Sequence, residues 1–355
     1  MQRYVGLDVH AASTTIAVVG PSGKVLRTDV AETNGQALIT ALGRIAGQLH
    51  VCLEEGTQSA WLYEILSPHV EELVVTAVGE SRGALGQKSD AIDAVKLAEQ
   101  LRTGTIAKRV YKDELGAYRA LRELGRTHAM VVRDVVRVQN RLKSFYRSRG
   151  VDVAGKKVYG KKGRGDYLQQ LPSGTRAATE TLYAEYDGLL EIRDRAEKEL
   201  LEESRRHTVS RILQTCPGLG PIRVAQLIPI VMTPRRFRTK RQFWSYCGLG
   251  IVMRSSSDWV RGSEGKWQRA QVQRTRGLSY QHNQQLKVIF KGAATTVITQ
   301  LPDEPLHGDY QKLLERGTKP NLAKLTIARR LAAITLALWK TEEDYDPARF
   351  RKQSA

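Results

Sequence analysis

We expect an α/β domain at the N-terminus of this chain, a helical coiled-coil connection after it, and a mostly α-helical domain at the C-terminus. Strand and helix patterns alternate over roughly the first hundred residues, long charged helical patterns follow, and a Gly-Pro turn then precedes amphipathic helices. The 355 residues suffice for two or three domains. The predicted regions are 1–112, 113–213 and 214–345, with a tail at 346–355.

The N-terminal region begins with three predicted strands in an antiparallel meander. They read RYVGLDVH, TTIAVVG and KVLRTDVAET, and Pro21, Ser22 and Gly23 form the turn between the last two. A helix with Asn34 as candidate N-cap follows, then the strands LHVCLEEG and LVVTAVG around the helical AWLYEILSPHV, and then a helix that Gly104 ends. This is the order of an RNase H-like or RuvC-like domain, although actin-like ATPases share it.

The middle region predicts two long helices, from about Glu114 to Arg149 and from about Ala177 to Leu213. Between them lies the basic stretch GKKVYGKKGRGD, which we expect to be a flexible loop or an arm that contacts phosphates. Two long helices around such a loop suggest an antiparallel coiled coil useful for dimerisation. A simple helical spacer is the alternative.

The C-terminal region opens with CPGLGPIRVAQLI, a tight Gly-Pro turn before a helix. Such a turn lets backbone N–H groups approach a DNA phosphate, as in helix-hairpin-helix motifs, but similar turns also simply join helices. The segment FWSYCGLGIVMRSSSDWVRG follows a basic run, and NLAKLTIARRLAAITLALWK predicts a helix that packs in the core. Trp244 is expected in the core, whereas Trp259 and Trp267 are candidates for stacking on bases.

The charge balance favours a nucleic-acid partner. Lysine plus arginine number 56 against 37 acids, a formal charge of +19, with a pI near 9.9. The sequence contains no long apolar run and no signal-peptide pattern, so we expect a cytoplasmic, nucleoid-associated protein without a membrane partner. The three cysteines are widely spaced in apolar surroundings and are expected to be buried, reduced thiols: Cys52, Cys216 and Cys247.

Four acids are the candidate metal ligands. Asp8 lies inside the first strand, Glu54 ends the fourth, and Asp90 and Asp93 lie three residues apart on one helix face. An RNase H-like fold brings these positions together at one edge of its sheet. Because like charges raise each other's pKa, such a cluster calls for a compensating cation, and Mg²⁺ prefers carboxylate oxygens. His10 also follows the first acid, but we interpret it as a strand-edge or nucleic-acid-contacting histidine rather than a ligand.

The segments YVGLDVH, VCLEEGT, KSDAIDAVKLAEQL, CPGLGPIRVAQL and FWSYCGLGIVMRSSS together resemble transposases of the insertion-sequence-110 family, over nearly the full chain. The resemblance implies a RuvC-like DEDD domain bound to Mg²⁺, a coiled coil, and a C-terminal transposase domain with a catalytic serine. It assigns the tetrad to Asp8, Glu54, Asp90 and Asp93. Glu55 is the alternative second acid, but only one of two adjacent strand residues faces a given side, and Leu53-Glu54 matches the family's apolar-Glu pair.

The resemblance also assigns the nucleophile, with two departures. Ile251 stands where the family has proline and Ser257 where it has glycine. Alignment from the preceding Gly-Leu places the nucleophile at Ser256, with Ser255 and Ser257 as alternatives. Candidate nucleic-acid contacts are the basic residues Lys240, Arg241, Arg254 and Arg276.

These observations lead to the expectation of a DNA recombinase that excises and inserts a mobile element. The resemblance implies attack of the serine on DNA, a bridge RNA that pairs with donor and target DNA, and a dimer or tetramer. The alternatives are a RuvC-like Holliday-junction nuclease with water as nucleophile and a non-catalytic nucleic-acid-binding relative. An actin-like ATPase is disfavoured because only GPSG stands where a phosphate loop would lie.

Overall fold

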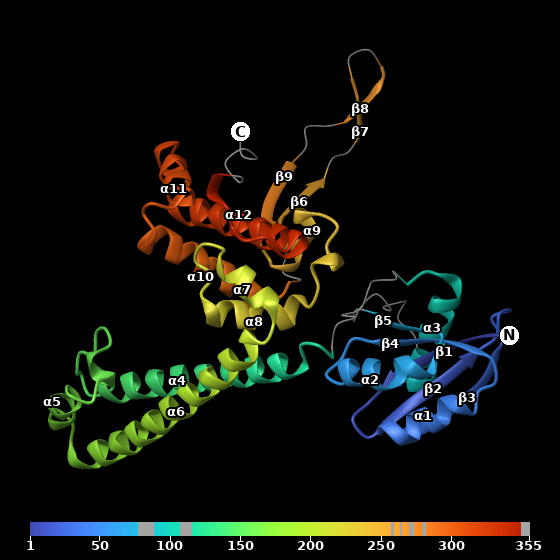
Figure 1. Ribbon diagram of the computed structural model, residues 1–355, viewed down its shortest axis with the longest axis horizontal. Helices are drawn as coiled ribbons and strands as arrows, with labels where there is room; N and C mark the ends of the chain where they lie inside the picture. The colour runs from blue at the N-terminus through green and yellow to red at the C-terminus, as the bar shows by residue number, and fades with distance from the viewer. Residues whose placement is uncertain are drawn as a thin grey trace. The chain divides into compact units, whose positions relative to one another are not determined.

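The structure is a computed structural model that describes residues 1–76, 89–106, 116–256, 259–262, 265–269, 273–278 and 282–348. It divides into two compact units, Met1–Ala117 and Tyr118–Ala355 (Figure 1). The expected boundary at residue 112 lies outside the described residues. The two helical regions form one unit because Leu121 and Leu200, from the long helices, belong to the C-terminal core.

The first unit is built on a five-stranded sheet. Its strands are β1 (Gln2–Val9), β2 (Ser13–Val19), β3 (Val25–Glu32), β4 (Gln48–Glu54) and β5 (Glu72–Thr76). Their order across the sheet is β3-β2-β1-β4-β5, with β1, β2 and β3 antiparallel and β4 and β5 parallel to β1. This confirms the predicted RNase H-like arrangement.

The helices of this unit are α1 (Gly35–Gly43), α2 (Ser59–Leu66), the 3₁₀ turn η1 (Ser67–His69) and α3 (Asp90–Thr103). The predicted cap is confirmed, because the Asn34 side chain accepts a hydrogen bond from the Ala37 amide. The predicted stop is also confirmed: Gly104 ends α3 in the left-handed conformation at φ 69°. α3 packs against β1, β2 and β4 and therefore covers one face of the sheet.

The second unit begins with two long helices, α4 (Arg119–Arg147) and α6 (Ser173–Arg205), which pack along each other. Their direction is antiparallel: Gln139 hydrogen-bonds Tyr186, while Gly125 lies opposite Leu200. Figure 1 shows this helical hairpin with its tip at α5 (Arg164–Gln169). The predicted helix pair is confirmed, except that the second helix ends at Arg205 and a separate helix, α7 (Thr208–Gln214), follows it.

The basic stretch at the tip was expected to be a flexible loop or an arm that contacts phosphates; the flexible loop is wrong, and contact with phosphates stays a prediction. It contains the 3₁₀ turn η2 (Lys157–Tyr159) and the start of α5, and Val158 is fully buried. Arg164 explains why the segment folds back. Its guanidinium lies 4.3 Å from the centre of the Tyr183 ring and forms two 2.7 Å hydrogen bonds with the Asp187 carboxylate.

The rest of the second unit is a helical bundle with two small β-ribbons. The helices are α7 (Thr208–Gln214), α8 (Pro221–Val231), the 3₁₀ turn η3 (Pro234–Arg236), α9 (Lys240–Tyr246), α10 (Gln284–Gln300), α11 (Pro305–Glu315) and α12 (Pro320–Thr341). The ribbons are β6 (Ile251–Ser256) with β9 (Gln273–Leu278), and β7 (Trp259–Arg261) with β8 (Trp267–Arg269). α12 contacts α7, α9, α10 and α11, as predicted for a core helix. Trp244 packs against this core and donates from Nε1 to the Arg329 carbonyl.

The Gly-Pro turn before α8 has a packing role. Gly218 has φ 75°, and a Cβ atom there would overlap the carbonyl oxygen of Ala293 in α10. Arg223 secures the turn by donating to the Gly218 carbonyl at 2.7 Å and to Thr296. The close approach to α10 accounts for the glycine.

The cysteine and membrane expectations can also be compared with the structure. All three cysteines are buried free thiols, as predicted. None of the described helices combines the length and the apolar character needed to cross a membrane.

Candidate active site

Two of the predicted acids lie on neighbouring parallel strands. The β1–β4 register pairs Leu7 with Leu53, so Asp8 and Glu54 each follow that pair by one residue. Side chains alternate along a strand, which places both acids on the face opposite to Leu7 and Leu53. Cys52, two residues before Glu54, packs with Leu97 of α3. Asp8 and Glu54 are therefore on the face that α3 covers.

The other two acids lie in the first turn of α3. Ser89 caps this helix by accepting from the Ile92 amide, and Asp90 and Asp93 follow it. Carboxylates are stabilised at this end of a helix because the backbone N–H groups point toward them. The cap therefore fixes where the two acids project.

Gly6 brings this helix end close to Asp8. A Cβ atom at residue 6 would overlap the Ala94 carbonyl oxygen and lie 2.8 Å from the Ala98 amide nitrogen. α3 thus packs directly on the backbone of β1, with no side chain between them. Because Asp8 is two residues further along the same face, the first turn of α3 comes within reach of its carboxylate.

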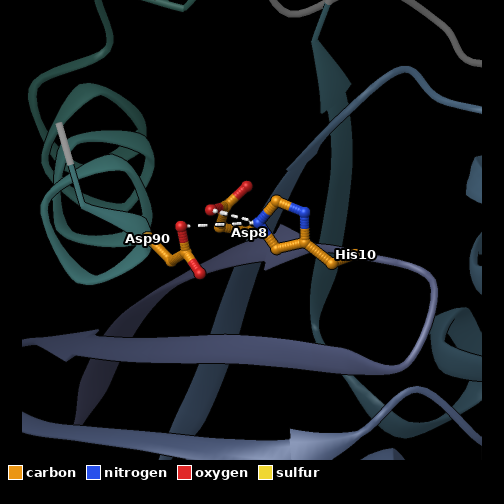
Figure 2. Close-up of side chains that lie close together, drawn as sticks. All are labelled: Asp8, His10 and Asp90. Carbon is orange, nitrogen blue, oxygen red and sulfur yellow. Dashed lines mark ion pairs between the residues drawn. The ribbon is translucent and has the colours of Figure 1, made fainter.

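Asp8 and Asp90 converge on one imidazole. His10 Nε2 lies 3.3 Å from Asp8 Oδ2 and 3.5 Å from Asp90 Oδ1, as Figure 2 shows. One potential ligand atom from each of the three residues lies within 4.8 Å of the others. Asp8 is 24% exposed and Asp90 62%, so the cluster is open to solvent on the helix side. Within the described residues, the ion pairs of both acids are to His10 and to no lysine or arginine.

The pKa of the Asp8 carboxyl reflects burial first and neighbouring charges second. Burial raises the pKa of its carboxyl above the ordinary value, the neighbouring His10 opposes this, and the carboxylates of Asp90 and Asp93 raise it further. An acid in this position ionises at a cost that a bound cation would offset.

Glu54 and Glu55 differ in their position relative to β4. Burial raises the pKa of the Cys52 thiol to about 12, and the charge of Glu54 adds to the effect, as expected of residues on one face. β4 ends at Glu54, which pairs with Thr76 of β5, and the Glu55 amide completes this pair by donating to the Thr76 carbonyl at 2.7 Å, so Glu54 is the last glutamate held in strand geometry. Of the two glutamates, Glu54 shares the face of Asp8.

These residues fit a divalent cation by the chemistry of their donors. Carboxylate oxygens are what Mg²⁺ and similar hard cations take up, and Asp8 and Asp90 offer two such groups within one cluster. His10 adds a nitrogen that Mg²⁺ accepts less readily than transition metals do. Within the described residues, the side chains brought together around a possible ion position are those of Asp8, His10 and Asp90; Glu54 shares the face of Asp8, and Asp93 lies in the first turn of α3, but neither belongs to this group.

The predicted nucleophile lies in the second unit. Ser256 ends β6 and pairs with Gln273 of β9, Ser255 pairs with Arg274, and Ser257 lies outside the described residues. The four acids belong to the first unit and the serine to the second, and each unit is described by itself. A strand, rather than a loop, carries the first two serines.

Comparison with known families covers most of the chain. A sequence model of DEDD transposases of the IS110 group matches residues 5–148, and a model described as transposase IS116/IS110/IS902 family matches residues 210–311. The chain belongs to the IS110 family of transposases. It is thus an enzyme of a class that acts on DNA, and DEDD transposases use divalent metal ions. No curated protein matches the chain.

The first family match spans all four acids of this transposase, and the second spans the serine segment. The basic candidates lie in the second match. Lys240 begins α9 with its ammonium 5.8 Å from the Trp244 ring, and Arg241 beside it is exposed. Arg254 pairs with Thr275 and Arg276 with Met253 across the β6–β9 ribbon.

Two residues of the transposase site were not predicted in their present roles. His10 lies between Asp8 and Asp90. The only feature of the sequence that could have indicated this role is that His10 follows Asp8, an acid on a strand, by two residues. Gly6 allows the close approach of α3, and an isolated glycine in a strand is a recognised sign of such an approach. The site thus depends on a histidine and a glycine in addition to the predicted acids.

Proposed function

We propose that this IS110-family transposase is a site-specific DNA recombinase that cleaves and rejoins strands through Ser256. One observation supports it most: acids from β1 and α3, 82 residues apart as Asp8 and Asp90, converge at one edge of an RNase H-like sheet. Family membership supports the DNA substrate. The choice of Ser256 rests on the resemblance described above.

In the proposed reaction the Ser256 hydroxyl attacks a DNA phosphate. The new Oγ–phosphorus bond replaces the bond to a deoxyribose oxygen, which leaves with a proton, while the hydroxyl proton passes to a base. The phosphoserine link keeps the energy of the broken phosphodiester, so ATP is not required. A free hydroxyl of the other DNA strand then attacks the link, restores the serine and completes the exchange.

Asp8, Glu54, Asp90 and Asp93 hold Mg²⁺ in this proposal. When bound, the ion supplies positive charge that polarises a phosphate and favours deprotonation of the attacking oxygen. The acids contribute by fixing the site at the end of the sheet, and Gly6 contributes by letting α3 reach it. Ser256 belongs to the second unit, so the active form must bring that unit, from the same or another copy, to the acids.

The choice of DNA sequence is proposed to come from a bridge RNA that pairs with donor and target. A +19 charge suits binding to the backbone of such an RNA and of DNA. The proposed assembly is a dimer or tetramer. Sequencing the RNA that co-purifies with the protein tests this step: one discrete species with two loops complementary to the element end and the target is expected, and random host fragments would contradict it.

The serine is tested by trapping the covalent intermediate. Wild-type protein with labelled element-end DNA should give a protein–DNA adduct on a denaturing gel. Ser256→Ala should abolish both the adduct and cleavage, while Ser255→Ala, the matched control on the same strand, retains them. Continued cleavage by Ser256→Ala without an adduct would identify a nuclease that uses water, as in Holliday-junction resolvases.

A further inference from the structure

The β7–β8 hairpin exposes aromatic surface that the proposed chemistry does not use. Trp259 is 58% exposed and Trp267 63%, the two most exposed of the five tryptophans in the chain. Large aromatic side chains are normally used in cores, and exposed ones that gather together mark binding surfaces. The remaining tryptophans lie in helices: Trp61 in α2, Trp244 in α9 and Trp339 in α12.

The register of the hairpin puts the two tryptophans on one face. Arg261 pairs with Trp267 across the strands, and Trp259 precedes Arg261 by two residues, so all three side chains share a side. The Arg261 guanidinium lies 5.6 Å from the centre of the Trp267 ring, a cation–π distance. The face thus combines flat aromatic rings with a cation.

The charge of the hairpin indicates the chemistry of its partner. The segment from Trp259 to Arg269 contains three basic residues and one acid, and Lys266 at the turn is exposed. Aromatic rings that stack on bases, beside cations that neutralise phosphates, are how proteins hold unpaired nucleic-acid strands. A purely apolar partner would gain nothing from the arginine and lysine.

The position of the hairpin in the chain indicates which nucleic acid. Trp259 is three residues after Ser256, so their Cα atoms are at most about 11 Å apart whatever the path between them. A DNA strand whose phosphate lies at Ser256 therefore has its neighbouring nucleotides within reach of the hairpin. This step rests on the proposed function, because it takes Ser256 as the residue that meets DNA.

We propose that the Trp259–Arg261–Trp267 face of the β7–β8 hairpin binds unpaired DNA bases next to the cleaved phosphate. Strand exchange requires bases near the break to leave their duplex, and unstacking them costs free energy. Stacking on the two indoles offsets that cost. The hairpin holds the separated strand while its end is exchanged.

The test measures binding alone, with full-length protein, so that it is independent of cleavage. The probes are an oligothymidylate, an abasic strand of the same length and an oligouridylate, at fixed ionic strength. The variant Trp259→Leu with Trp267→Leu keeps apolar surface but removes the indoles, and Trp61→Leu in the other unit is the matched control. We expect the double variant to bind oligothymidylate on the order of 10- to 100-fold more weakly, and the abasic strand and the control to be unaffected.

Tryptophan fluorescence gives a second readout. Oligothymidylate should quench the emission of wild-type protein, and the quenching should be lost in the double variant. Unchanged affinity for oligothymidylate, or an equal loss with the abasic strand, would overturn the proposal. So would a loss confined to oligouridylate, or a change only in sedimentation, which would assign the face to RNA or to a second copy of the chain. The binding measurement needs no cleavage and the adduct assay with Ser256→Ala needs no tryptophan variant, so failure of the base-binding proposal and failure of the proposed nucleophile are distinguished by separate results.

Discussion

The pKa of a carboxyl is shifted in opposite directions in the acidic cluster and at the tip of the helical hairpin. At the tip, Asp187 receives two hydrogen bonds from Arg164, which lower its pKa. In the cluster, burial and neighbouring acids raise the pKa of Asp8. A carboxylate that pairs with an arginine of the same unit stabilises the fold. Carboxylates that lie together, with no lysine or arginine partner among the described residues, are suited to bind a cation from solution.

The largest expected effect is on DNA cleavage by Asp8→Asn. Because the variant keeps the shape of the side chain but removes a ligand charge, cleavage should fall on the order of 10³-fold. Rates of adduct formation on element-end DNA measure this. Asp194→Asn, at an exposed acid paired with Arg193 in α6, is the control and should cleave normally. Equal cleavage by Asp8→Asn and Asp194→Asn would contradict the assignment of Asp8 to the active site.

Gly6→Ala should disturb the cluster through packing alone. The added methyl group overlaps the Ala94 carbonyl, so α3 must move, at a cost of about 3 kcal/mol in the free energy of unfolding, with loss of cleavage. Denaturant unfolding and the cleavage assay check the two effects. Gly20→Ala is the control because its Cβ would make only ordinary contact with Leu26, at 3.5 Å. Normal cleavage by Gly6→Ala would show that the position of α3 does not matter.

At the tip, Arg164→Ala should destabilise the helical hairpin without touching the acids. It leaves the Asp187 carboxylate without its two hydrogen bonds and the Tyr183 ring uncovered, at a cost of about 2 kcal/mol. Urea unfolding monitored at the second unit measures it. Arg193→Ala, whose partner Asp194 is 66% exposed, should cost far less. Equal effects of the two variants would refute the structural role of the partly buried Arg164–Asp187 pair.

The smallest effect is the dependence of tip stability on pH. Arg164 holds the pKa of Asp187 below its ordinary value, so the pair contributes stability above that value and loses it as pH falls through the lowered pKa in the folded state. We expect a loss of about 1 kcal/mol below about pH 4. Asp187→Asn should lack this component in acid unfolding curves. An identical acid response of variant and wild type would contradict the assignment.

Much of the fold could be predicted from local signals. Alternation in the five strands, the cap at Asn34 and the stop at Gly104 are properties of short segments, and the structure has each of them. The approach of Asp90 to Asp8 could also be predicted, but only through the fold class, since no local signal links residues 82 apart.

Other features depend on contacts between distant residues. The tip sequence is rich in glycine and lysine and therefore predicts a loop. The residues that hold Arg164 in place are Tyr183 and Asp187, and both lie on the next long helix, outside the local sequence pattern. The β-ribbons are short and polar, so they lack the apolar alternation that identifies a strand. Their pairing, such as that of Ser256 with Gln273, joins residues distant in sequence and cannot be predicted from either segment alone. His10 escaped prediction because its second neighbour, Asp90, comes from α3.

Thermal unfolding with and without Mg²⁺ tests the cation site most directly, since it needs neither DNA nor RNA. We expect Mg²⁺ to raise the Tm of the wild-type protein and of Asp194→Asn, because an ion that binds the folded cluster stabilises it. Asp8→Asn should unfold at a higher temperature than wild type in the absence of the ion, since repulsion is relieved, and should not respond to Mg²⁺. An equal response to Mg²⁺ in wild type and Asp8→Asn, or none in either, would contradict the account.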